Sequence, residues 1–335
     1  MIIDGVQETI ETNKGSYQII LKNGKKVFVK NLKSSIVPEL EGYNMIKMYY
    51  NVPKLLDYDL VNSSITYDYN EGLKNNTLHH ALFNNVYVDI DKIVNLLTFR
   101  FKDFEFKNEN LSVNSKFFIG RLSEIVKYLE SNDELYHKKL FYNNVYLGTF
   151  KSIVRQVVEG ISQNNIVPFV ISQGDPTDLN ISTNYMVSDY EVAGKNSIIN
   201  EVAIFVGCYI VNCYYYYIKY MHSPHAKFKT TLEKYNNYVK CTYLCEDDKL
   251  IVNFRQIIPS NVKNLILKYL IKVRDIGIIH PKFNLGVYIA LRFMSPVNIN
   301  KIKKVDDKLI LMVLSGLFVK KYKTINQIIK FVKEI

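Results

Sequence analysis

Two carboxylates and one amide stand out near the middle of the chain, at the ends of very apolar segments. Asp175 lies in a turn rich in Gly, Pro and Asp, Asn180 follows five positions later, and Asp189 follows nine positions after Asn180. The pattern predicts a hairpin: a buried strand, the turn, a short strand from Asn180 and a return strand that ends at Asp189. Such a hairpin brings the three side chains to one end. In phosphoryl transfer, one carboxylate can accept a hydroxyl proton while an amide and a second carboxylate hold magnesium.

Aspartate in a turn of this composition usually has a structural role, because its side chain closes turns and caps helices. That interpretation accounts for Asp178. It accounts less well for Asp175, Asn180 and Asp189 together, since an unpaired carboxylate beside apolar strands is costly unless a cation or hydrogen bonds compensate. A site that neutralises ATP phosphates would provide that cation.

Lys30 is the next candidate, because it ends the strand that begins at Val27 and lies about one helix upstream of Glu39 and Glu41. A lysine at the end of a central strand, paired with a glutamate of a helix, can contact the phosphates of ATP. Taken alone, Lys30 is more simply a solvated lysine at a strand end. The order of strand, lysine, helix, glutamate and hairpin favours the phosphate-binding interpretation.

The elements that position these residues can be predicted from side-chain periodicity. Alternating apolar and polar residues predict strands at 6–12, 16–21, 26–32, 54–59 and 64–69. Pro38 and apolar residues at helical spacing predict a helix at 37–49. The Asn23-Gly24 dipeptide predicts a hairpin turn in which both residues take positive φ.

Beyond residues 70–85, which we interpret as a crossing between two lobes, the chain is predicted to be helical apart from the hairpin. Three-to-four-residue apolar spacing predicts helices at 89–105, 113–131, 134–142, 146–164, 197–222, 225–244, 261–275, 282–294, 305–319 and 324–334. The expected fold class is therefore α+β. We expect a small, β-rich N-terminal lobe at residues 1–70 and a large helical C-terminal lobe at 71–335, which carries the hairpin.

The composition excludes wholesale disorder, because 48% of the 335 residues are hydrophobic and 22% are charged. The net charge of +11 favours anionic partners such as nucleotides. The basic residues are scattered, which argues against nucleic acid. The longest uncharged run, 202–218, is slightly short for a membrane span, and we expect a buried helix there. Four cysteines and an N-terminus without signal-peptide features lead us to expect a cytoplasmic protein.

The stretch from Gln173 to Glu191 resembles the catalytic loop and metal-binding motif of the aminoglycoside phosphotransferase and choline kinase superfamily, a branch of the protein-kinase-like fold. The spacing from Asp175 to Asn180 and on to Asp189 matches that family's pattern, as does the aromatic residue and Glu that follow Asp189. The resemblance covers about residues 6–210, because the order of further elements is also similar: Lys30, Glu41, Val52-Pro53 and Tyr67-Asp68-Tyr69.

This resemblance implies a two-lobed protein-kinase-like fold and an ATP- and magnesium-dependent kinase. The acceptor would be a hydroxyl of a small molecule, such as a sugar, an amino alcohol or an aminoglycoside-like compound. By position, Asp175 would be the catalytic base, and Asn180 and Asp189 would ligate magnesium. Lys30 would hold the α- and β-phosphates, with Glu41 rather than Glu39 as its ion-pair partner.

Two further contacts are implied in the N-terminal lobe. The loop that ends at Ser16 would cover the phosphates. Backbone groups near Tyr67, Asp68 and Tyr69 would meet adenine.

The sequence departs from the family's pattern in three ways. Gln173 stands where the family usually has His, the loop at 12–16 contains one glycine, and Phe28 stands where a smaller side chain commonly lines the adenine pocket. A pseudokinase that binds nucleotide and acts as a scaffold is therefore the alternative, and a basic nucleic-acid-binding protein is a second one.

Other residue clusters allow other chemistry, each beside a simpler explanation. His222, His225, Cys241 and Cys245 could ligate zinc, although cysteines four apart on the predicted helix at 225–244 are more typical of a core. Tyrosines between 209 and 243 could form an aromatic cage for a quaternary ammonium or stack on bases, although helical packing explains their spacing. His79-His80 could touch a substrate, although loop histidines are usually solvated.

Overall fold

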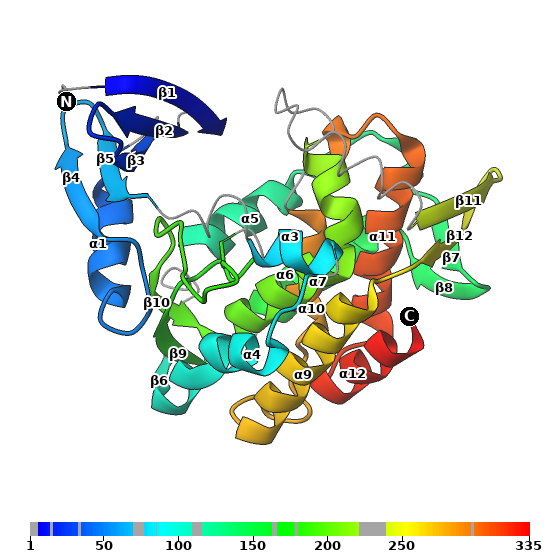
Figure 1. The fold of residues 1–335 in the computed structure, drawn as a ribbon. Coiled ribbons are helices and arrows are strands. Elements are labelled where there is room, and N and C mark those ends of the chain that lie inside the picture. Colours follow the sequence, from blue (N-terminus) through cyan, green and yellow to red (C-terminus); the bar gives the residue numbers. More distant parts are fainter. Residues whose placement is uncertain are drawn as a thin grey trace. The chain divides into compact units, whose positions relative to one another are not determined.

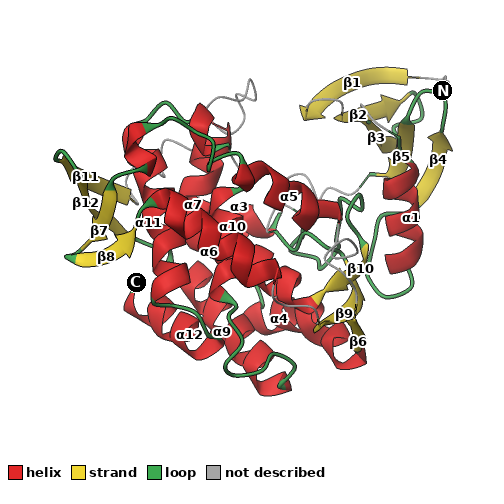
Figure 2. Ribbon diagram, turned by 180° about the vertical axis from the view of Figure 1, so that it is seen from behind, coloured by secondary structure: helices red, strands yellow, loops and turns green. Residues whose placement is uncertain are grey.

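The computed structural model describes residues 6–13, 16–32, 35–69, 77–84, 86–108, 116–162, 166–177, 180–220, 239–295 and 298–335. Within them, strands dominate the N-terminal region and helices the C-terminal region, so the predicted α+β class is confirmed (Figures 1 and 2). The chain forms two compact units. The first unit consists of Met1–Lys92 and Ile171–Lys195, and the second of Ile93–Val170 and Asn196–Ile335. The lobe boundary expected at residues 70 and 71 stays a prediction.

The first unit contains a five-stranded antiparallel sheet, and its strands lie where alternation predicted them. Its order is β1-β2-β3-β5-β4, with bounds Val6–Asn13, Ser16–Leu21, Lys26–Asn31, Ser64–Asp68 and Leu55–Asp59 in that order. The predicted hairpin turn at Asn23-Gly24 is present. The prediction of positive φ for both residues was wrong at Asn23, whereas Gly24 has a φ of 78°. The loop between β2 and β3 closes through a hydrogen bond from the Leu21 amide to the Lys25 carbonyl. The loop is thus longer than the two-residue turn that the dipeptide suggested.

Helix α1 (Val37–Ile46) follows β3, starts with Pro38 in its first turn and ends three residues before the predicted end. Its buried face is formed by residues at i, i+3, i+4 and i+7, namely Glu39, Gly42, Tyr43 and Ile46. Gly42 lets the helix lie directly against the chain after the hairpin: a Cβ there would be 2.0 Å from the carbonyl oxygen of Tyr190. The absence of a side chain at position 42 therefore fixes how closely α1 approaches Tyr190.

The hairpin begins with β9 (Ile166–Ser172), which lies in a three-stranded sheet of order β10-β9-β6 with Gly194–Ser197 and Glu105–Asn108. The short strand expected from Asn180 and its return strand are reduced to a single antiparallel bridge between Ile181 and Val187. The Val187 amide donates to the carbonyl of Asn51, which holds the hairpin to the segment before β4. The hairpin is therefore positioned by contacts with its own unit rather than by a long ladder.

The second unit is mainly helical, and α10 (Gly286–Met294) lies at its centre with every residue buried. It packs against α7 (Ile198–Tyr220), α6 (Phe150–Ser162) and α11 (Val305–Lys320). The other helices are α5 (Lys116–Val126), α9 (Ser260–Ile276) and α12 (Ile325–Glu334). The run at 202–218 falls in α7, and its residues up to Ile210 are buried as expected. Among the described helices, none is both long and apolar enough to cross a membrane.

Helix α3 (Leu78–Phe83) lies within the segment where the crossing was expected, and α4 (Ile90–Thr98) follows that segment. Short 3₁₀ helices lie at Phe99–Asp103, Glu134–Tyr136 and Ile299–Lys301.

The α-helical predictions for 134–142 and for the described part of 225–244 were wrong. Apart from the 3₁₀ turn at Glu134–Tyr136, the first of these segments forms a strand, and so does the second. Both strands belong to a four-stranded sheet of order β11-β12-β7-β8, with bounds Val239–Cys245, Lys249–Gln256, Lys139–Tyr142 and Val145–Gly148. The predicted helix at 146–164 begins only at Phe150, because its first residues belong to β8. In β12, Leu250 and Val252 are fully buried while Ile251 between them is not, which is the period-two pattern of a strand.

Replacing Gly42 with alanine tests the close approach of α1. Helix propensity alone would favour alanine by about 1 kcal/mol, but the new Cβ would collide with the Tyr190 carbonyl. We expect a net loss of about 1–2 kcal/mol in the free energy of unfolding, measured by urea denaturation. Glu41→Ala, at an exposed position of the same helix, is the control and should unfold like the wild type. A Gly42→Ala protein as stable as the control would contradict this contact.

Candidate functional site

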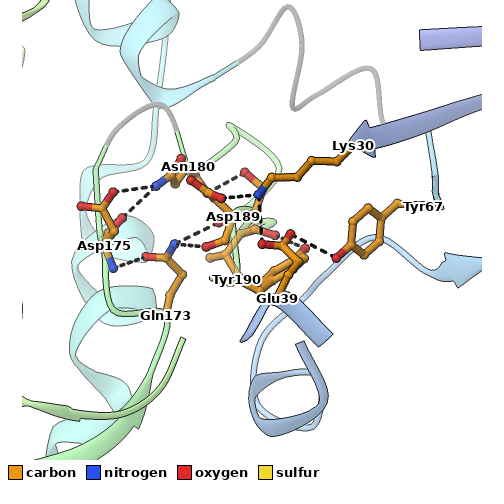
Figure 3. Close-up of polar contacts among 10 residues, drawn as sticks. Lys30, Glu39, Tyr67, Gln173, Asp175, Asn180, Asp189 and Tyr190 are labelled. Carbon is orange, nitrogen blue, oxygen red and sulfur yellow. Dashed lines mark hydrogen bonds and ion pairs between the residues drawn. The ribbon is translucent and has the colours of Figure 1, made fainter. Parts of the chain in front are cut away.

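Lys30 lies near the end of β3, on the face of the strand opposite the buried Val27 and Val29. Its ammonium is held by two carboxylates: Nζ is 2.9 Å from Oε2 of Glu39 and 2.6 Å from Oδ1 of Asp189 (Figure 3). The three residues come from β3, α1 and the hairpin, and all belong to the first unit. Lys30 and the hairpin, which the sequence linked only through the order of the elements, are thus in direct contact.

Glu39, and not the predicted Glu41, is the ion-pair partner of Lys30. Successive helical residues are about 100° apart, so Glu39 shares the buried face of α1 with Gly42 and Tyr43, while Glu41 lies on the far side and is exposed. Glu41 was preferred because of its distance from Val52-Pro53. Helical spacing was the better signal, because Glu39 occupies a position of the buried stripe.

Burial and charge act against each other in this group. Burial alone would lower the pKa of Lys30, but the carboxylates of Asp189 and Glu39 outweigh it and hold that pKa above its ordinary value. Burial raises the pKa of Glu39, and the nearby ammonium of Lys30 opposes that rise. Lys30 therefore carries a positive charge at neutral pH and lies between the carboxylates of Glu39 and Asp189.

Gln173 connects the two sides of the hairpin. Its Nε2 donates to the carbonyl oxygens of Ser188 and Asp189, both at 2.9 Å, and its Oε1 accepts from the backbone amide of Asp175 at 2.9 Å. The Gln173 side chain is buried, so water could not take its place as the hydrogen-bond partner of these backbone groups. Glutamine offers two donors and one acceptor, and here it uses all three functions to hold the backbone at Asp175 against the backbone at Asp189.

Asp175 and Asn180 contact each other on the same side of the hairpin. The amide nitrogen of Asn180 donates to the backbone carbonyl of Asp175 at 3.1 Å and to its carboxylate at 3.3 Å. Gly174 takes a positive φ of 86°, which turns the backbone directly before Asp175, and Asp189 itself has a φ of 63°. Aspartate tolerates this left-handed region better than most residues, because its short polar side chain can hydrogen-bond locally.

The donor set at Asn180 and Asp189 fits magnesium. One amide oxygen and one carboxylate are hard oxygen ligands, and the Asp189 side chain is 48% exposed, so it can reach an ion. Among the described residues, no group of three or more His, Cys, Asp or Glu side chains could hold a metal by itself. Magnesium usually takes one or two protein ligands and completes its shell with phosphate oxygens and water.

The remaining predicted site residues lie in the same unit. Ser16 is buried at the start of β2 and pairs with Lys30 across the sheet, while the preceding positions 14 and 15 lie outside the described residues. The Asp68 amide donates to the carbonyl of Lys54, and the Tyr69 ring lies 5.8 Å from the ammonium of Lys26. The expected contacts of these residues with phosphates and adenine stay predictions.

Tyr67 has a contact that the sequence argument missed. Its hydroxyl donates to Oε1 of Glu39 at 3.2 Å, and burial and the neighbouring Glu39 carboxylate keep its pKa above the ordinary value, so it stays a donor. Its ring lies in a cluster with those of Tyr43 and Tyr190, with centroids 5.3 to 5.8 Å apart. The alternation of β5 could have placed the Tyr67 side chain on a buried face, but nothing in the sequence names Glu39 as its partner.

The structure rules out Cys241 and Cys245 as ligands of the same zinc ion. Cys241 and Cys245 lie on strand β11 and not on a helix. Four residues of a strand separate them by about 13 Å, too far for one metal ion. His222 and His225, and the side chains of the tyrosine block at 214–217, lie outside the described residues. His79 is buried rather than solvated, and His80 is exposed.

Comparison with known proteins gives structural similarity at low sequence identity. No protein family and no curated protein matches the chain. The chain is similar to choline kinase LicA from Streptococcus pneumoniae, with a TM-score of 0.45, 12% identity and 95% of each chain covered. A structure of LicA in complex with AMP is similar at a TM-score of 0.44 and 14% identity, covering 93% of this chain and 84% of that one.

An aminoglycoside phosphotransferase from Alicyclobacillus acidocaldarius subsp. acidocaldarius is similar at a TM-score of 0.40 and 9% identity. The match covers 99% of this chain and 94% of that one. These similar structures come from the superfamily that the motif at Gln173–Glu191 resembles.

Replacing Gln173 with alanine tests its role in the hairpin. The variant leaves one buried amide and two carbonyls without their partner, at a cost of about 1–3 kcal/mol for each unsatisfied group. We expect the backbone amide of Asp175 to exchange its hydrogen at least roughly tenfold faster, measured by hydrogen–deuterium exchange. The control is Gln156→Ala on α6, where the side chain bonds only to its own helix, at the Ser152 carbonyl. Equal exchange at Asp175 in both variants would show that Gln173 does not hold the hairpin.

Proposed function

We propose that this protein is an ATP- and magnesium-dependent phosphotransferase that phosphorylates a hydroxyl group of a small molecule. The observation that carries the proposal is the placement of the Lys30 ammonium between Glu39 and Asp189. The same compact unit holds Asp175 in contact with Asn180, and Gln173 links the backbone of Asp175 to that of Asp189. A fixed cation, a carboxylate for a proton and two oxygen ligands for a metal are the parts that phosphoryl transfer requires.

Lys30 binds the phosphates of ATP in this proposal. Its pKa is raised by the two carboxylates, so it carries a full positive charge at neutral pH. Glu39 keeps the ammonium in place, because the carboxylate is buried and cannot turn into water. Such a preorganised charge stabilises the transferred phosphoryl group without reorganisation during the reaction.

Asp175 receives the proton of the acceptor hydroxyl. Its backbone is fixed by Gln173 through the Asp175 amide, and its carboxylate is oriented by the side-chain amide of Asn180. A positioned carboxylate of this kind aligns the hydroxyl for attack on the γ-phosphate and takes its proton as the bond forms.

Asn180 and Asp189 hold magnesium, which, when bound, neutralises the charge of the phosphates. Gln173 ties the backbone of Asp189 to that of Asp175, so the metal ligand and the base keep a constant separation. A polycationic aminoglycoside would prefer an acidic environment, and the net charge of +11 favours a sugar, an amino alcohol or another hydroxyl compound over it.

Replacing Asp175 with asparagine tests the chemistry. The variant keeps an oxygen for Asn180 but cannot take a proton. We expect phosphoryl transfer from ATP to a panel of small hydroxyl compounds to fall by roughly 10²- to 10⁴-fold. Binding of ATP with magnesium, measured by calorimetry, should persist.

The matched control is Asp57→Asn, at an exposed position on β4, and it should transfer like the wild type. A wild-type protein that binds no nucleotide would refute the proposal. Binding without transfer to any acceptor would instead indicate the scaffold alternative.

The corrected assignment of the ion pair gives a second test. Glu39→Gln removes the negative charge that holds Lys30, whereas Glu41→Gln changes an exposed side chain two positions away. We expect kcat/KM for ATP to fall by roughly tenfold or more in Glu39→Gln, since Lys30 loses the buried carboxylate that holds it and keeps only the exposed Asp189. Glu41→Gln should match the wild type in steady-state kinetics. The reverse ranking would restore Glu41 as the partner.

A further inference from the structure

The hydroxyl of Tyr67 has no part in the reaction as proposed above, yet it touches the group that holds Lys30. Glu39 divides its two oxygens: Oε2 accepts from the Lys30 ammonium at 2.9 Å and Oε1 accepts from the Tyr67 hydroxyl at 3.2 Å. Figure 3 shows Tyr67 and Lys30 reaching the Glu39 carboxylate from two strands of the sheet. The Glu39 side chain is only 1% exposed, so each oxygen depends on its protein donor.

Tyr67 itself is held firmly. It is 4% exposed, and its ring lies 5.8 Å from that of Tyr43 and 5.7 Å from that of Tyr190. A ring enclosed in this way cannot turn its hydroxyl toward water. The Tyr67 hydroxyl is therefore an immobile hydrogen-bond donor to Oε1 of Glu39.

Lys30 has a second carboxylate partner, Asp189, which differs from Glu39 in solvent exposure and in its distance from the ammonium. Asp189 is 48% exposed and lies 2.6 Å from the ammonium, closer than Glu39. Each carboxylate competes for the same ammonium. Any change that weakens the hold of Glu39 on Lys30 strengthens the hold of Lys30 on Asp189, because a partly buried ammonium needs a counter-charge.

We propose that Tyr67 is a positioning residue: its hydroxyl fixes Glu39 so that Lys30 is shared, which leaves Asp189 able to bind magnesium. The inference rests on the proposed function, in which Asp189 is a metal ligand. Without the hydroxyl, Oε1 of Glu39 loses its donor and the carboxylate no longer holds Lys30 in one geometry. Lys30 then pairs mainly with Asp189, and magnesium must displace it.

The test replaces Tyr67 with phenylalanine and measures how much Mg²⁺ is needed for ATP binding. Calorimetric titrations of ATP at a series of Mg²⁺ concentrations give the concentration for half-maximal affinity. We expect this concentration to rise roughly five- to tenfold in Tyr67→Phe, the size of the net contribution of one ordinary hydrogen bond. Phenylalanine keeps the ring cluster, so the variant should remain folded.

The matched control is Tyr43→Phe, which removes a hydroxyl from the same cluster. That hydroxyl accepts from the Leu55 amide and does not touch Glu39. Its Mg²⁺ requirement should stay within about twofold of the wild type. An unchanged Mg²⁺ requirement in Tyr67→Phe, or an equal rise in both variants, would overturn the positioning role while the phosphotransferase proposal stands.

A second measurement needs no nucleotide and separates this inference from the proposed function. The melting temperatures of Tyr67→Phe, Lys30→Met and the double variant form a thermodynamic cycle. Because the two residues meet through Glu39, the double variant should lose clearly less than the sum of the two single losses. Additive losses would overturn the inference, even for a protein that binds no ATP. The absence of ATP binding with non-additive losses would refute the proposed function, while the coupling of Tyr67 to Lys30 through Glu39 would stand.

Discussion

The arrangement of the first unit depends on one buried requirement, the neutralisation of the Lys30 ammonium. Its two carboxylates come from α1 and from a hairpin 159 residues further along the chain. An ammonium on a central strand is costly unless counter-charges reach it, so sheet, helix and hairpin must approach one point. Gly42 permits that approach on α1, and the rings of Tyr43, Tyr67 and Tyr190 fill the space behind the charges. Packing and charge thus specify the same arrangement.

A neutral side chain carries the second link. Gln173 joins the backbone at Asp175 to the backbone at Asp189 by three hydrogen bonds, and Lys30 joins Asp189 to Glu39. A continuous chain of contacts therefore runs from Asp175, the proposed base, to Glu39 on α1. Position 173 is a glutamine, where the family that the hairpin motif resembles usually has histidine. In the structure, the amide provides donors and an acceptor at once, and it does so without a titratable proton.

Sequence reasoning succeeded where one local pattern decided the outcome. The strands between Val6 and Asp68 lie where the pattern of apolar and polar residues predicted them. The side chains of Asp175 and Asn180 are in contact, as their spacing led us to expect. It failed where the pattern was short or where a partner lay far away. Four-residue strands such as Lys139–Tyr142 are too brief to separate period two from helical spacing. Position along the chain favoured Glu41 as the partner of Lys30. The face of the helix decides the ion pair instead, because it places Glu39 on the buried side of α1.

The two carboxylates that contact Lys30, to which the proposed function gives different duties, differ most in their solvent exposure. Glu39 is 1% exposed, so exchanging its partner for water or a metal would first require solvating a closed space. Asp189 is 48% exposed and can trade the ammonium for an ion with its hydration shell at little cost. The buried carboxylate is therefore suited to hold the lysine permanently, and the exposed one to release it. In the proposed function, solvent access thus separates two carboxylates of equal charge: Glu39 keeps the lysine in place, and Asp189 exchanges it for the metal ion.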